Sequence, residues 1–197
     1  MTTREHLKLS RPKNDSKTLS EMVLETPRVR ISTPTEPILP GRGFYQLEED
    51  SLHVQIGHFS KHRRFFSYLE SENVRFDLDR EGRLIFIEVA VARRQWIVDP
   101  LITPPEVVEA ADIRWLDFRA AVNEPSLLCS SDRTLLLLKY ASKTKLQNYH
   151  LADTVIAQVD ESNRLAAMWI TDIIDDLAGQ EIAAFRKKIR GERVSFT

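Results

Sequence analysis

The chain has 197 residues, and its 28 Lys and Arg against 29 Asp and Glu give a formal net charge of −1. This balance argues against a dedicated nucleic-acid or membrane-surface protein. The lone Cys129 excludes a disulfide framework and cysteine-based zinc sites. No apolar run reaches the ~18 residues of a membrane span and the N-terminus has no signal-peptide core, so we expect a cytoplasmic protein without a membrane partner.

Residues 1–40 predict a polar N-terminal tail followed by a proline-rich linker. Residues 1–18 are polar and weakly basic, a composition typical of disorder. Residues 26–40 hold four prolines among alternating polar and apolar residues, which indicates an extended linker with an edge strand at 29–31. The folded core is therefore expected to begin near residue 41.

The chain then carries two stretches of similar sequence. Residues 68–84 align with residues 149–165 at one constant offset of 81 residues, and residues 50–56 resemble residues 132–138 after a slip of one residue. The identical pairs are Tyr68/Tyr149, Val74/Val155, Asp79/Asp160, Arg83/Arg164 and Leu84/Leu165. A repeat at fixed offset predicts two copies of one structural unit, and the alternative is two unrelated hairpins that share a turn chemistry.

Each unit is predicted to form four antiparallel β-strands. In the first unit, apolar and polar residues alternate over 74–78, as in a half-buried strand, and the apolar run 84–89 indicates a strand covered on both faces. Asp79 begins the turn between them, and Gly82 can take positive φ there. In the second unit Asn163, the next most tolerant residue, stands in the place of this glycine.

Helices are predicted between and after the units. The first unit covers residues 41–98 and the second covers residues 126–172. In the connecting residues 99–125, Thr103 starts a capping box with proline at the first helical position, which predicts a short helix. Residues 173–191 combine an apolar stripe with acidic residues at the start and basic residues at the end, which predicts a C-terminal amphipathic helix. The predicted class is α+β, mainly β, with pseudo-twofold packing of the units in one compact domain.

The first unit resembles a small bacterial family of unknown function, the domain-of-unknown-function family 2283. That family combines an Asp-x-Leu-Tyr-Ile strand with an Asp-x-x-Gly-x-Leu-x-Gly-Ile-Glu hairpin, and residues 43–89 match both motifs. Residues 127–170 match only through the repeat. Phe86 stands where the family has glycine, Asn163 replaces the turn glycine, and Trp169 replaces the final glutamate. The resemblance implies a β-hairpin fold, duplicated in tandem, and no activity, because the family has none assigned.

The segment before Tyr68 holds the candidate site residues. They are His58, Lys61, His62, Arg63, Arg64, Phe65 and Phe66. The two histidines are four apart, a spacing that puts two metal ligands on one helix face, but the cationic surroundings and the missing carboxylate oppose a metal. Basic and aromatic residues interleave over 61–68, a combination that can follow a phosphate backbone and stack bases. A solvated basic loop anchored by one phenylalanine explains the same pattern.

These observations favour a non-catalytic binding or scaffolding module that self-associates and needs no cofactor. The chain has no glycine-rich phosphate loop and no nucleophile elbow, and a duplicated unit often replaces what a symmetric dimer of single units does. A protein partner is compatible with this hypothesis. The first alternative is a nucleic-acid-associated protein that uses residues 61–68 and the basic run 186–193. The second is an enzyme whose site lies between the two units.

Overall fold

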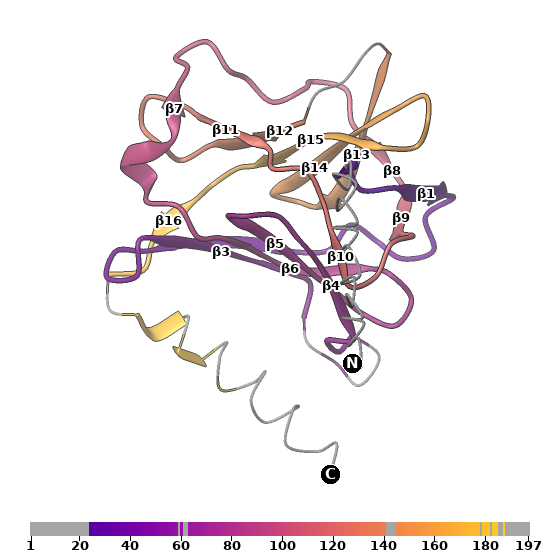
Figure 1. The fold of residues 1–197 in the computed structure, drawn as a ribbon, viewed down its shortest axis with the longest axis horizontal. Helices are drawn as coiled ribbons and strands as arrows, with labels where there is room; N and C mark the ends of the chain where they lie inside the picture. Colours follow the sequence, from indigo (N-terminus) through magenta and orange to yellow (C-terminus); the bar gives the residue numbers. More distant parts are fainter. Residues whose placement is uncertain are drawn as a thin grey trace, which may run out of the picture.

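Two stacked β-sheets and a two-stranded ribbon make up the fold (Figure 1). The computed structural model describes residues 24–58, 60, 63–140, 145–177, 179–181, 183, 184 and 187. Each large sheet has seven strands. The described chain is mainly β, which corrects the predicted α+β class.

The first sheet consists of five consecutive strands flanked by two short strands from elsewhere in the chain. The five are β2 (Gly41–Gln46), β3 (Ser51–Ile56), β4 (Ser67–Glu70), β5 (Val74–Leu78) and β6 (Leu84–Val89), and all pair antiparallel. The edge strands β10 (Ala120–Ala121) and β16 (Ile174–Asp175) run parallel to their neighbours. The order is β10-β4-β5-β6-β3-β2-β16.

The second sheet repeats this plan with different strands. Its five central strands are β11 (Ser126–Cys129), β12 (Leu136–Lys139), β13 (Leu146–Ala152), β14 (Val155–Asp160) and β15 (Leu165–Ile170), and its parallel edges are β7 (Ile97–Val98) and β8 (Glu109–Ala110). The order is β7-β11-β12-β15-β14-β13-β8. Each unit thus has five central strands and not the predicted four, because the segments around Tyr68 and Tyr149 pair as β4 and β13 and do not form loops.

The central hairpins of the two sheets pair in the same register. Val74 pairs with Val89 in β5–β6, and Val155 pairs with Ile170 in β14–β15, which is the offset of 81 read from the sequence. Both ladders also shift register at the corresponding point near the turn. The two hairpins therefore correspond residue by residue, including their irregularity.

The strands before these hairpins correspond at a different offset. Leu52 in β3 pairs with Val89, and Leu136 in β12 pairs with Ile170, so β3 corresponds to β12 at an offset of 84 residues. The slip is three residues, and the predicted slip of one is wrong. The segment that joins β3 to β5, which includes the basic loop and β4, is consequently three residues longer than its counterpart in the second unit.

The two tyrosines that first suggest the repeat do not occupy corresponding places. Tyr68 pairs with Asp77, whereas Tyr149 pairs with Ala157, the counterpart of Phe76. A register irregularity in β13 moves Tyr149 by one position, and a one-residue slip turns a side chain to the opposite face of a sheet. Tyr149 is accordingly buried, while Tyr68 is half-buried.

Each unit sends the strand that follows its last central strand into the other sheet. After β6 the chain passes through the short 3₁₀ helix η1 (Arg93–Gln95), and β7 then pairs with β11 of the second sheet. After β15 the chain crosses in the opposite direction, and β16 pairs with β2 of the first sheet. Arg93 forms an ion pair with Asp175, so the two crossing segments also contact each other.

The ribbon links the turns of both central hairpins. It pairs β1 (Val29–Ser32), the edge strand predicted in the linker, with β9 (Asp112–Trp115). The Trp115 N–H donates to the Gly82 carbonyl at 2.7 Å, and the Val29 N–H donates to the Asn163 carbonyl at 2.9 Å. Each ribbon strand is therefore bound to one turn in the same way.

The two turns have the predicted chemistry. The Asp79 carboxylate accepts the backbone N–H groups of Glu81 and Arg83, and Asp160 accepts the equivalent pair in the second unit. Gly82 has φ of 76° and Asn163 has φ of 56°, both in the left-handed region. These short side-chain to backbone bonds are typical of Asx turns, and they fix both hairpins locally.

One hydrophobic core joins the two sheets. Its cluster contains Leu52, Phe76 and Ile87 from the first sheet together with Leu138 and Met168 from the second. A smaller cluster lies on the outer face of the second sheet, where Ile102 and Val108 pack against Trp169. The units 41–98 and 126–172 therefore share one interior and form a single domain.

The helix predicted from Thr103 is wrong. Residues 102–105 have no regular secondary structure, and β8 follows at Glu109–Ala110. An isolated helix of two turns is marginal in water, and here the backbone instead pairs with β13 in the sheet. Packing of Ile102 and Val108 on the outer face of the second sheet holds this segment extended.

The C-terminal helix predicted over 173–191 is also not supported. Its first part is strand β16, since Ile174 and Asp175 pair with β2. In the described part of the chain no helix reaches seven residues, and none is long and apolar enough to cross a membrane. Ile182, Phe185 and Ile189 of the predicted apolar stripe lie outside the described residues, as does the tail 1–18.

Replacing Gly82 tests the contact between the turn and the ribbon. A Cβ atom at this position would lie 2.4 Å from the Trp115 carbonyl oxygen, and the residue has positive φ. We expect Gly82→Ala to lower the free energy of unfolding by about 2–4 kcal/mol, and the matched change Asn163→Ala by about 1 kcal/mol. Urea denaturation measures both values, and equal losses would contradict this explanation.

Candidate functional site

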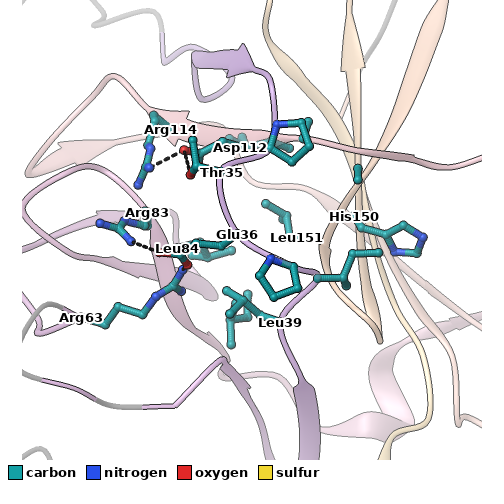
Figure 2. Close-up of a pocket in the computed structure, with 17 residues that line it drawn as sticks. Thr35, Glu36, Leu39, Arg63, Arg83, Leu84, Asp112, Arg114, His150 and Leu151 are labelled. Carbon is teal, nitrogen blue, oxygen red and sulfur yellow. Dashed lines mark hydrogen bonds and ion pairs between the residues drawn. The ribbon is translucent and has the colours of Figure 1, made fainter.

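A cleft of about 60 Å³ opens beside the ribbon, under residues 33–40, which we call the arm (Figure 2). The arm connects β1 to β2 and forms one wall. The opposite walls come from Arg63 in the basic loop, from Arg83 and Leu84 at the start of β6, and from β8, β9 and β13. Residues from both units thus meet at this point.

Three arginines with largely buried side chains line the cleft. The exposed fraction of the side chain is 11% for Arg63, 14% for Arg83 and 13% for Arg114. A buried guanidinium requires carboxylate partners, because its charge loses hydration. All three arginines have such partners in the described structure, and these partners define the site.

The arm supplies the carboxylate that joins two of the arginines. Arg63 Nη2 lies 3.0 Å from Glu36 Oε2, and Arg83 Nη1 lies 3.4 Å from Glu36 Oε1 (Figure 2). Each carboxylate oxygen therefore has its own guanidinium. The Glu36 side chain is 51% exposed, so a half-exposed acid on the arm is bound by two nearly buried bases.

Arg83 is also held from the other side by the turn. Its Nε lies 3.3 Å from Asp79 Oδ2, and its Nη2 donates to Glu81. Burial lowers the pKa of the Arg83 guanidinium, but the Glu81 hydrogen bond and the surrounding carboxylates outweigh burial and raise this pKa overall. Burial raises the pKa of the Asp79 carboxyl, against the two backbone N–H groups and the Arg83 charge.

Arg114 extends the network into the ribbon. It lies 3.4 Å from Glu81 and also donates to Asp112, and the Thr35 hydroxyl donates to the same Asp112 carboxylate. The arm is therefore connected to the ribbon through Thr35 and to the first sheet through Glu36. The cluster as a whole alternates three bases with four acids.

The cleft exists because the two units differ in how their edges are covered. At the offset of 84 that relates β2 to β11, Glu36 corresponds to Ala120 in β10, which pairs with β4 at the edge of the first sheet. The corresponding edge of the second sheet, β13, is already paired with β8. The arm therefore cannot add to the sheet as β10 does, and it lies across the cleft with mostly exposed residues.

The predicted site residues are dispersed, and one of them lies in the cleft. Arg63 contributes to the cleft through its bond to Glu36. His58 is exposed at the end of β3, and Lys61 and His62 lie outside the described residues. No group of three metal-ligating side chains occurs in the described ranges, which include His58 but not His62.

The remaining predicted residues point to separate places. Arg64 has its Nε atom buried. Phe65 packs against Ile85 and Phe86 on the outer face of the first sheet. Phe66 contacts the Phe118 ring instead, with centroids 6.2 Å apart. The two phenylalanines therefore do not form one stacking surface.

Sequence reasoning missed Glu36, Arg83 and Arg114 as site residues. Arg83 was explained by its repetition as Arg164, and Glu36 lay in a segment that predicted only a linker. The available signal was a single acidic residue within a proline-rich stretch, Thr-Pro-Thr-Glu-Pro. Nothing in the sequence pairs that residue with an arginine 47 positions later.

A second polar cluster also escaped prediction, on the outer face of the first sheet. Ser51 Oγ lies 2.8 Å from His53 Nε2, and Glu49 lies 4.0 Å from the same nitrogen. A hydrolytic triad needs the acid on the opposite ring nitrogen from the hydroxyl. Both of these contacts fall on Nε2, and Ser51 and His53 are each 5% exposed, so the hydroxyl is not accessible to a substrate.

No family model matches the chain, and no curated protein matches it significantly. The resemblance of residues 43–89 to the domain-of-unknown-function family 2283 stays a prediction. Functional inference therefore depends on the cleft itself.

Asp79 forms an ion pair with Arg83 of the cleft, and we expect its replacement to lower the free energy of unfolding. Asp79→Ala leaves two backbone N–H groups without their acceptor and removes the buried carboxylate that forms an ion pair with Arg83 Nε, and we expect a loss of about 3 kcal/mol or more in unfolding free energy. Asp160→Ala removes the same turn bonds at a more exposed place, so about 1 kcal/mol is expected. Chemical denaturation of both variants checks this, and a smaller loss for Asp79→Ala would contradict it.

Proposed function

We propose that the protein is a non-catalytic binding module whose cleft receives a carboxylate or a similar oxyanion of its ligand. The observation that carries this proposal is the pair of largely buried guanidiniums, Arg63 and Arg83, that bind both oxygens of one half-exposed carboxylate. Arginine is suited to this role because its planar fork of donors matches the two oxygens of a carboxylate.

The contacts in the cleft support binding more than catalysis. The described acids and bases of the cluster are engaged in ion pairs with one another, and general acid–base catalysis would need a group within reach of a substrate proton. The side chains of Leu84, Ile113 and Leu151 add an apolar surface beside the guanidiniums. Polar groups contribute more of the cleft lining than apolar groups do, which suits an oxyanion held by charged side chains.

We do not advance the nucleic-acid and enzyme alternatives. Nucleic-acid binding by residues 61–68 would need several exposed aromatic faces next to basic groups. Phe66 is 45% exposed with Arg80 over its ring, but Phe65 packs on the outer face of the first sheet, so the two phenylalanines do not form one stacking surface. A catalytic site between the units would need a nucleophile or a proton-transfer group. His150 lines the cleft, with its Nδ1 atom 3.3 Å from the Ala152 carbonyl oxygen, and the arginines that line the cleft are paired with carboxylates.

Self-association is a separate part of the proposal. The observation that favours it is a run of exposed apolar side chains along β7 and the segment after it, where Leu101 is 85% and Val107 is 76% exposed. Leu101 follows β7 and Val107 precedes β8, at opposite edges of the second sheet, so the exposed apolar side chains form an extended surface and not one compact patch. A second copy of the chain is the partner that we propose for this surface.

Titration with small anions tests the proposed cleft. In the full-length protein, sodium acetate and inorganic phosphate at low ionic strength should cause saturable NMR shifts of the amides of Arg63, Arg83 and the arm. Arg63→Ala should abolish the shifts, because it removes one of the two guanidiniums. Arg94→Ala, which changes an exposed arginine paired with Asp50, should leave them intact. No saturable shift at tens of millimolar anion in the wild type and in Glu36→Ala would refute the proposal.

Light scattering tests self-association. We expect the wild type to elute as a dimer at micromolar concentration, and the double change Leu101→Lys with Val107→Lys to shift it to a monomer, because two charges cannot be buried unpaired in an apolar interface. Leu177→Lys changes an equally exposed leucine elsewhere and should leave the mass unchanged. A monomeric wild type would exclude this part of the proposal.

A further inference from the structure

We infer that the ligand of the Arg63 and Arg83 pair is an acidic, proline-flanked peptide segment of a partner protein, and that the arm, which forms one wall of the cleft, holds Glu36 on this pair as a displaceable stand-in for it. This inference rests on the proposed function. The arm sequence, Thr-Pro-Thr-Glu-Pro-Ile-Leu-Pro over residues 33–40, is then the closest description of the ligand that the chain itself contains.

The first part of the arm is held mainly by Glu36, and its end is held by the backbone and by Leu39, which packs against the core, while the Pro40 carbonyl accepts the Gly57 N–H at 2.7 Å. Glu36 holds both arginines, Thr35 contacts Asp112 at 3.4 Å, and the Leu39 carbonyl accepts the Asp153 N–H at 2.8 Å. Residues 32–38 are exposed, and the arm pairs with no strand in the described structure. Loss of the Glu36 and Thr35 contacts would free the exposed residues 33–38, while Leu39 and Pro40 keep their contacts with the core and with Gly57.

Two of the three arginines are oriented by groups outside the arm, whereas the carboxylate partner of Arg63 is Glu36 of the arm. Arg83 is oriented by Asp79 and Glu81, and Arg114 by Asp112, so both keep their positions when Glu36 leaves. Arg63 is set by a tight turn in which its N–H donates to the Ser60 carbonyl at 3.1 Å. Its Nη1 atom is buried with no hydrogen-bond partner in the described part of the chain, which leaves a donor for a ligand oxygen.

The chemistry of the walls favours a peptide over a free anion. Pro34, Pro37 and Leu39 of the arm line the cleft together with Ile56 and Leu84, so the groups on both sides of the acid also have apolar neighbours. Proline-rich segments are extended before they bind and lose little entropy on binding. A bare acetate or phosphate would use the guanidiniums alone.

The charges around the cleft nearly cancel when Glu36 leaves, so we expect them to attract a ligand only at short range. Without Glu36, Arg63, Arg83 and Arg114 face the three carboxylates of Asp79, Glu81 and Asp112, with His150 beside them. The receptor is then close to neutral. Affinity should therefore depend on the geometry of the arginine pair and on apolar contact, and should fall only modestly with salt.

The arm competes with the partner because it is part of the same chain. A short tether gives it an effective concentration in the millimolar range. A free peptide must displace Glu36 in the wild type, but it meets an open site when Glu36 is replaced. The inference therefore predicts that loss of one acidic residue strengthens binding of an acidic peptide.

Fluorescence anisotropy with the labelled peptide Thr-Pro-Thr-Glu-Pro-Ile-Leu-Pro tests this in the full-length protein. We expect Glu36→Ala to bind the peptide at least about tenfold more tightly than the wild type. The matched control is Glu25→Ala, which breaks an exposed ion pair to Arg164, the counterpart of Arg83, outside the cleft, and should bind as the wild type does. A peptide with glutamine in place of glutamate should not bind, and Arg63→Ala added to Glu36→Ala should abolish binding.

The outcomes separate the inference from the proposed function. If Glu36→Ala gives saturable shifts with acetate but does not bind the peptide, the cleft binds anions and the peptide inference fails. If it binds neither probe while thermal melting shows a folded protein, both fail. Glu36→Gln keeps the size of the side chain and serves as the second variant, and equal peptide affinity in the wild type and both Glu36 variants would also overturn the inference.

Discussion

The reciprocal exchange of β7 and β16 is the constraint on which the rest of the structure depends. Because each sheet takes an edge strand from the segment that follows the other sheet, neither sheet is complete without the other. The ion pair between Arg93 and Asp175 joins the crossing segments, and the single core between the sheets follows from this arrangement. Domain swapping between two chains creates the same dependence, and here one chain contains both partners.

The cleft lies where the correspondence between the units fails. The segment between β3 and β5, which contains the basic loop with Arg63, is three residues longer than its counterpart in the second unit. In addition, β8 pairs with the edge strand β13, so the arm has no free strand to pair with there. Arg83, which has a counterpart in the second unit, lines the cleft together with the basic loop and the arm and binds Glu36 of the arm. Its counterpart Arg164 binds Glu25 at the surface instead.

The sequence predicted the features that are set by neighbouring residues. The Asp79 and Asp160 turns, the left-handed Gly82 and Asn163, and the strands around them follow from side-chain to backbone bonds within four positions. The helix from Thr103 failed because its local capping signal was weaker than strand pairing with a segment 40 residues away. Likewise, nothing local indicates that β7 and β16 exchange sheets.

The site was hidden from sequence for the same reason. Arg63 was found because basic and aromatic residues crowd one segment, but its partner Glu36 is 27 positions earlier in a stretch whose prolines indicate only an extended chain. Arg63 and Arg83 together supply the guanidinium donors for one carboxylate. The fold brings these two arginines together, and no pattern in the sequence indicates their pairing. That an exposed arm holds its one acid against two buried bases, while its other side chains remain largely in solvent, is better explained by an occupied binding site than by a structural need of the arm.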